Sequence, residues 1–161
     1  MIDGLVMEMV HYYAGDAHQI QHFMKVHGYA RLIGTREKVC AQTMEVLEAA
    51  AVVHDIGIKP AMEKYGRCDG PLQEKEGAPI AKEMLKRLSF GESVVDRVCF
   101  LVAHHHTYAD IDGIDYQILV EADFLVNLHE GKKSREAAEE TCLRIFRTET
   151  GKNLCRQMFL A

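Results

Sequence analysis

Apolar residues along most of the chain recur every three or four positions, which is the period of a helix with one buried face. Alternating apolar and polar runs joined by hairpin turns, the signature of strands, are missing. The pattern predicts helices over residues 5–13, 17–33, 36–55, 71–88, 92–105 and 116–129, another after Ser134, and a last one over 152–159. We therefore expect an all-α fold, a helical bundle of about six to eight helices.

Local signals set the expected ends of these helices. Asp16 is expected to cap the second helix, Thr35 the third, with Glu37 near the capping-box position, and Ser134 the helix that follows it. Residues 57–70 are expected to form a loop interrupted by a short turn. Pro71 can open the helix that follows this loop, because proline suits the first helical position.

The chain shows no repeat, no low-complexity linker and no domain boundary. A length of 161 residues suits one domain with a sizeable core. We therefore expect a single domain over 1–161, with a motif-bearing core at about 16–130 and carboxyl-terminal helices over 134–159 that pack on it.

Composition limits the cellular location and the classes of binding partner that we expect. Apolar residues make up 48%, charged residues 27% and the net charge is −5, which argues against broad binding of long nucleic acids. The amino end lacks the pattern of a secretion signal, and no stretch approaches the roughly 20 apolar residues of a membrane span. Five widely spaced cysteines without a C-x-x-C pattern fit reduced thiols. We expect a cytoplasmic protein that does not bind membranes.

Four polar residues fall where core residues are expected. His22 begins an apolar face of the second predicted helix, whereas His27 points about 140° away from it. His54 and Asp55 end an apolar run, and burying such a pair is costly unless it is neutralised or hydrogen-bonded. Asp123 shares a helix face with apolar neighbours. A divalent metal would satisfy these groups, and a salt bridge inside the bundle is the structural alternative.

Other polar residues near these positions are weaker candidates for a metal or substrate site. Glu121 and His129 lie off the face that carries Asp123, so we expect both to be solvated. His104, His105 and His106 are consecutive at a helix end, and consecutive helical side chains point about 100° apart. All three therefore cannot serve one site, although one or two can face a cleft.

The order His22, His54-Asp55, Asp123 on three predicted helices resembles the HD-domain superfamily of metal-dependent phosphohydrolases. Three patterns carry the resemblance: the segment from His22 to Gly34, the segment from Ala51 to Gly57 that holds the histidine–aspartate pair, and the segment from Glu121 to Asn127. They organise most of the chain and favour His22 over His18 or His27 as the first histidine.

The resemblance implies that His22, His54, Asp55 and Asp123 bind a divalent transition metal such as Mn, Fe, Co, Ni or Zn. Asp55 would also orient a water or take its proton. His105, His106 and Lys59 would face the substrate phosphate as cations or acid donors.

Two departures from the family pattern set expectations of their own. Gln73 stands near the position where many two-metal members have a histidine, so we expect one ion rather than two. Lys59 comes one residue later after Gly57 than in many members, which weakens its assignment as a phosphate contact.

We thus expect an enzyme that hydrolyses a small phosphoester, in the first place a nucleotide, through a metal-activated water. The alternative is a non-catalytic metal-binding HD domain that acts as a ligand-sensing or interaction module. A di-iron oxygenase is a third, less favoured outcome, because it needs further ligands. The sequence does not fix the substrate or the oligomeric state, and a homo-oligomer is compatible with it.

Overall fold

The computed structural model describes residues 1–161 and contains helices and no strands, which confirms the predicted all-α class. The elements are α1 (Ile2–Tyr12), α2 (Ala17–Arg36), α3 (Ala41–Val53), α4 (Ile58–Tyr65), α5 (Gly70–Arg87), α6 (Glu92–Val102), α7 (Ile114–Glu130), α8 (Arg135–Ile145), α9 (Glu149–Cys155) and the π-helical turn η1 (Arg156–Leu160). None of these helices is long and apolar enough to cross a membrane.

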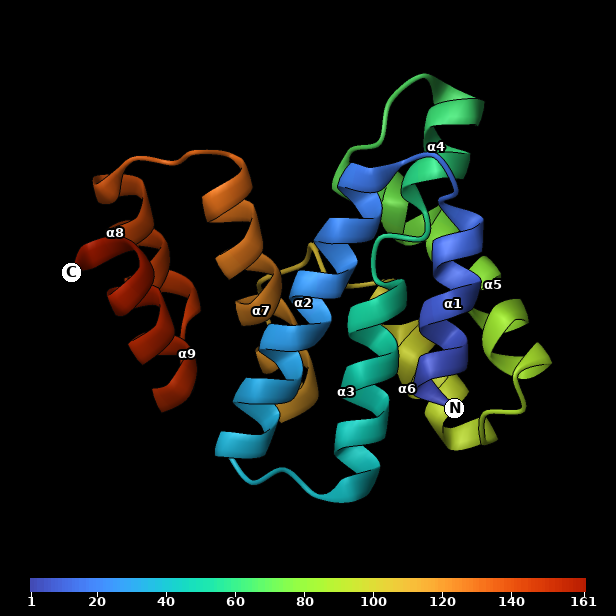
Figure 1. Ribbon diagram of the computed structural model, residues 1–161, viewed down its shortest axis with the longest axis horizontal. Helices are drawn as coiled ribbons and strands as arrows, with labels where there is room; N and C mark the ends of the chain where they lie inside the picture. Colours follow the sequence, from blue (N-terminus) through green and yellow to red (C-terminus); the bar gives the residue numbers. More distant parts are fainter.

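Helix α3 runs through the middle of the bundle and packs against α1, α2, α6 and α7 (Figure 1). Its second half, from Val46 to Val53, is buried except at Glu48. Each fully buried valine or leucine stabilises the fold by about 1.5–3 kcal/mol. The three small residues Ala49, Ala50 and Ala51 let the neighbouring helices approach. The chain that leaves this helix therefore emerges inside the protein, at His54.

Helices α2 and α7 pack on each other, and α2 also packs on α3. Helices α8 and α9 lie beside α7, on the left of Figure 1, whereas α1 and α5 lie on the right. One cluster of 36 buried apolar residues joins the two sides, because it contains Cys142, Phe146 and Cys155 as well as Leu5 and Met9.

Two of the expected caps are present, and one is wrong. The side chains of Asp16 and Ser134 accept hydrogen bonds from the backbone N–H groups of Gln19 and Ala137. Thr35 does not cap a third helix, because α2 continues through it to Arg36. The chain then turns through Lys38, whose φ is +57°, and α3 begins at Ala41.

The expected loop over 57–70 contains α4, a helix of 8 residues, in place of a short turn. This helix lies against α5, and Gly57 makes the close approach possible. A Cβ on Gly57 would lie 2.1 Å from the carbonyl oxygen of Gln73. Glycine at this position therefore brings the backbone after His54-Asp55 close to α5.

Two helix ends also differ from the expected ones. Helix α6 stops at Val102, short of the histidines, because residues 103–107 form tight turns and the Tyr116 hydroxyl donates to the carbonyls of His104 and Thr107. The last α-helix begins at Glu149, three residues before the expected start, with the Thr148 side chain as its cap.

Candidate metal centre

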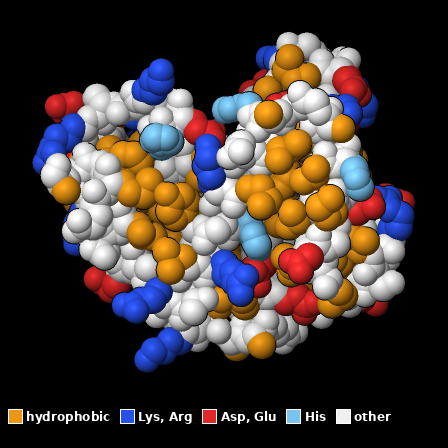
Figure 2. Space-filling view, viewed as in Figure 1, with side chains coloured by type: hydrophobic (Ala, Val, Ile, Leu, Met, Phe, Trp, Pro, Cys, Tyr) orange, Lys and Arg blue, Asp and Glu red, His pale blue; other side chains and the backbone are white.

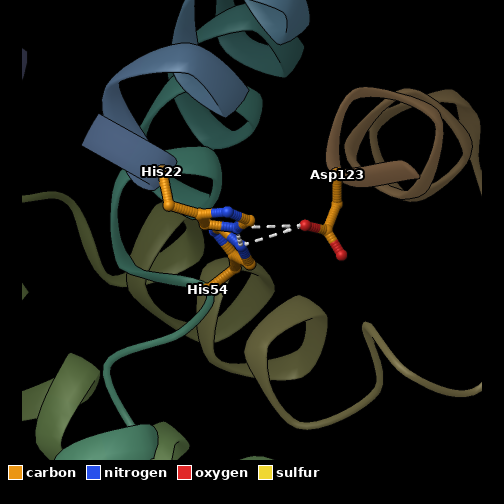
Figure 3. A group of neighbouring side chains, drawn as sticks. All are labelled: His22, His54 and Asp123. Carbon is orange, nitrogen blue, oxygen red and sulfur yellow. Dashed lines mark hydrogen bonds and ion pairs between the residues drawn. The ribbon is translucent and has the colours of Figure 1, made fainter. Parts of the chain in front are cut away.

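Three helices deliver His22, His54 and Asp123 to one point in the interior (Figure 3). The Nε2 atoms of His22 and His54 lie 3.3 Å apart. Asp123 Oδ1 lies 3.2 Å from His22 Nε2 and 3.5 Å from His54 Nε2. All three residues are buried, which confirms the inward faces predicted for His22 and Asp123.

Asp55 joins these residues from the turn after α3. Its Oδ2 atom lies 3.3 Å from His22 Nε2 and 3.4 Å from His54 Nε2. The amide of Gln19 donates to the same oxygen at 3.1 Å, and the hydroxyl of Tyr13 donates to the Asp55 carbonyl at 2.7 Å. We call His22, His54, Asp55 and Asp123 the central cluster.

Hydrogen bonds on the far side of each ring orient the imidazoles. His54 Nδ1 lies 2.9 Å from the carbonyl oxygen of Ala51, and His22 Nδ1 lies 2.9 Å from Glu130 Oε2. A carbonyl or carboxylate oxygen only accepts, so each Nδ1 carries a hydrogen and donates it. Each Nε2 therefore points at the aspartates, where it can carry a hydrogen or, in the neutral ring, offer its lone pair to a metal ion between them.

The charges of the central cluster depend on one another. Burial opposes ionisation of both histidines, yet Asp123 and Asp55 outweigh it and raise the pKa of His22 and, more strongly, of His54. Burial likewise opposes charge on the aspartates, but the histidines hold the pKa of Asp55 and Asp123 well below the usual range. Two carboxylates therefore stay ionised in the interior, and positive charge between them is required.

A second group, Asp55 with His105 and His106, lies beside the central cluster. Asp55 turns its other oxygen, Oδ1, to within 3.3 Å of His105 Nε2. His105 Nδ1 donates to the carbonyl of Val102 at 2.9 Å, and its buried Nε2 makes no hydrogen bond. The structure thus brings together two of the three consecutive histidines, His105 and His106.

Gln73 lies against His106. Its amide nitrogen donates to the carbonyl of Cys68, so its Oε1, 3.0 Å from His106 Nε2, accepts a hydrogen from that ring. Burial and the neighbouring His105 lower the pKa of His106 to about 4, so this ring is neutral at pH 7. His106 is therefore a neutral hydrogen-bond donor to Gln73 in this structure.

Several other histidines and Lys59 lie away from the central cluster. His27 Nε2 pairs with Glu48 at 3.0 Å, His18 is exposed, and the His104 ring stacks on Phe100. The exposed Lys59 donates to the carbonyl of Tyr12 at 3.3 Å and forms no hydrogen bond or ion pair with the central cluster.

The sequence did not single out two residues that hold the cluster, Glu130 and Gln19. Glu130 follows Asp123 by seven positions, which is two turns on the same face of α7, and Gln19 precedes His22 by three. This spacing is a signal that could have found both. It predicts a shared face, however, and not the contact across helices that each residue makes.

The ligand atoms fit a metal ion in kind and in spacing. Imidazole nitrogens and carboxylate oxygens bind transition metals at about 2.0–2.2 Å, which places neighbouring ligand atoms about 2.8–3.6 Å apart between octahedral and tetrahedral angles. The central cluster shows separations of 3.2–3.5 Å. The unpartnered lone pair of His105 adds a further nitrogen at its edge.

Comparisons with known proteins agree with this geometry. The family model described as the HD domain matches residues 20–146. A crystal structure of a predicted HD superfamily hydrolase from an uncultured Thermotogales bacterium is similar, with 27% identity and a TM-score of 0.67, and the match covers 97% of this chain and 82% of that one. No curated protein matches the sequence. The chain therefore belongs to the HD-domain superfamily, a family of metal-dependent hydrolases.

Proposed function

We propose that this protein is a metal-dependent phosphohydrolase that acts on a small phosphoester, in the first place a nucleotide. The observation that carries the proposal is the orientation of His22, His54 and His105. Each ring donates through Nδ1 and turns Nε2 toward the carboxylates of Asp55 or Asp123. Bundle cores rarely bury so many ionisable groups without a ligand between them.

In this proposal His22, His54, Asp55 and Asp123 hold one divalent ion, such as Mn, Fe, Co, Ni or Zn. Mixed nitrogen and oxygen donors suit these metals better than magnesium, which prefers oxygen shells. When bound, the ion supplies a water of lowered pKa and neutralises charge on a phosphoryl oxygen.

The protein's own residues then prepare the attack. Asp55 has one oxygen fixed by Gln19 at 3.1 Å and the other beside His105 at 3.3 Å. Its Oδ1 can therefore orient a water beside His105 and accept the proton of that water. Gln73 accepts the hydrogen of His106 Nε2, so the neutral ring keeps the Nδ1 lone pair beside Asp55, where it can accept a hydrogen bond from a water or a substrate hydroxyl.

Gln73 favours one ion over two. A second ion at Asp55, His105 and His106 would have to use His106 Nδ1, because Nε2 is engaged by Gln73. Both ends of the Gln73 amide are already hydrogen-bonded, and a neutral amide is a poor ligand for transition metals.

A panel of nucleotides and other phosphoesters, assayed with Mn or Co, tests the proposal. We expect turnover of at least one compound, and we expect a chelator to remove it. Asp55→Ala should abolish this activity while the helical circular dichroism stays unchanged. The matched control is Asp96→Ala, an exposed aspartate of α6 that should keep full activity.

Undiminished turnover by Asp55→Ala would contradict the proposal. Saturable binding of a panel compound without turnover would instead support the rival function, a ligand-sensing HD domain. Metal content measured on the same preparations should be near one equivalent per chain.

A further inference from the structure

A cavity of about 460 Å³ lies outside the central cluster, between α2, the carboxyl end of α7 and the last turn of the chain. Figure 2 shows the corresponding notch in the upper outline, with basic and histidine side chains on its walls. Its polar lining consists of Lys25, Lys132, Lys133, His18, His129 and Glu130. The volume is in the range of small-molecule sites.

The charge of this cavity contrasts with that of the whole protein. Three lysines and one glutamate line it, whereas the chain carries a net charge of −5. Lys25 is paired with Glu130 at 3.1 Å. Lys132 and Lys133 form no ion pair and no side-chain hydrogen bond. The lysines outnumber the single carboxylate, and such an excess of positive charge raises the local concentration of anions, so the cavity attracts anions.

The turn that ends α7 fixes the backbone positions of Lys132 and Lys133. The backbone N–H groups of Lys132 and Lys133 donate at 3.1 Å to the carbonyls of His129 and Leu128, which closes the helix end. Lys132 has a φ of +47° in this turn. The same kind of turn follows α2, where Lys38 has a φ of +57°. Lysine at the two turns differs chiefly in whether it faces a cavity.

Glu130 connects this cavity to the central cluster without merging the two. Its Oε1 accepts from Lys25, and its Oε2 accepts from the Nδ1 of His22. None of the four residues of the central cluster lines the cavity. A ligand here would therefore occupy a place of its own beside the metal centre.

We propose that this cavity binds a small molecule carrying phosphate groups, in addition to the phosphoester that reacts at the metal. Lysine ammonium groups bind phosphate oxygens as point charges, and three of them around one cavity suit more than one phosphate group. Leu128 and Phe159 supply an apolar part of the wall for the organic portion of such a ligand. The proposal goes beyond the hydrolase function and does not depend on it.

Pyrophosphate titrated calorimetrically into the metal-free protein tests the proposal, because the central cluster then offers no metal to the probe. We expect saturable binding of one equivalent. The double variant Lys132→Gly and Lys133→Gln should bind at least about tenfold more weakly, since it loses two of the three charges. Glycine is chosen because it accepts the positive φ of Lys132.

The matched control is the double variant Lys38→Gly and Lys86→Gln. It removes two exposed lysines, one of them from the equivalent turn after α2, and neither lines the cavity. We expect its affinity to stay within about twofold of the native value. Absence of saturable binding, or an equal loss in both double variants, would overturn the proposal. An inactive enzyme that still binds pyrophosphate would leave it standing.

Discussion

Two of the buried carboxylates on helix α7, Glu121 and Asp123, stand two positions apart and have opposite roles. Glu121 is fully buried, and Asp123 is 5% exposed. Glu121 accepts from the backbone N–H groups of Arg147 and Thr148, from the Thr148 hydroxyl and from the Gln117 amide. Asp123 instead faces two imidazole nitrogens and receives one amide hydrogen, from Asn127.

The hydrogen bonds of Glu121 hold α7 against the segment that precedes α9. Gly151 belongs to it, because a Cβ there would lie 1.9 Å from Glu121 Oε2. The negative charge of Glu121 is spread over neutral donors that point at it, as at an anion site built from backbone dipoles. These donors offset the cost of burying the Glu121 charge without a cation.

Burial alone therefore does not identify a functional carboxylate. What separates the two residues is their partners, which are backbone, hydroxyl and amide donors around Glu121 and two titratable imidazole nitrogens, able to exchange a proton for a metal, around Asp123. Substitutions at these two residues and near the central cluster should separate the loss of metal from the loss of stability.

The largest effect is expected from Asp123→Asn, which keeps the shape and removes the charge. The central cluster would lose a ligand, so hydrolysis should fall by about a thousandfold or more. Metal content, measured by elemental analysis, should fall with it. Retention of one tightly held equivalent would contradict the assignment of Asp123 as a ligand.

Glu121→Gln should give the opposite pattern. The new amide group would turn an N–H toward one of the surrounding donors, so the free energy of unfolding should drop by about 2–4 kcal/mol. Metal content and turnover of the folded fraction should stay unchanged. Chemical denaturation measures the loss, and a loss of metal with intact stability would abolish the distinction between the two carboxylates.

A smaller effect is expected from Glu130→Gln. The carboxylate that accepts from His22 would become a neutral acceptor, which lowers the basicity of the ring. Loss of such a partner weakens metal binding by about 10–100-fold. Competition with a fluorescent chelator measures the affinity, and Glu139→Gln, an exposed residue of α8, is the control. An affinity equal to the native value would mean that Glu130 only fills space.

The smallest effect is expected from Lys59→Ala. The ammonium group donates to the Tyr12 carbonyl and is exposed, so kcat/KM should change by no more than about threefold. A loss of a hundredfold or more would restore Lys59 as a phosphate contact, which is the role that the family resemblance implied.

The comparison of Glu121 with Asp123 also shows which features of the fold and the site the sequence can predict. Helical periodicity predicted the fold class and placed His22 and Asp123 on inward faces, because those faces repeat along single helices. Glu121 was predicted to be solvated, and that prediction was wrong. Its donors Arg147 and Thr148 lie 26 and 27 positions further on, so periodicity cannot reveal them.

Helix α4 and the roles of Glu130 and Gln19 were not predicted, because they too depend on contacts between segments that are distant in the sequence. The position of α4 depends on its packing against α5 through Gly57, and a helix of 8 residues is too short for periodicity to define. Glu130 and Gln19 become meaningful only when α2, α3 and α7 are brought together.

Anomalous diffraction from crystals grown with Mn would show whether the central cluster holds the ion. We expect one strong peak per chain, within about 2.0–2.3 Å of His22 Nε2, His54 Nε2, Asp55 Oδ2 and Asp123 Oδ1. A structure with no peak among these four atoms, or with the ion held elsewhere in the molecule, would contradict this expectation.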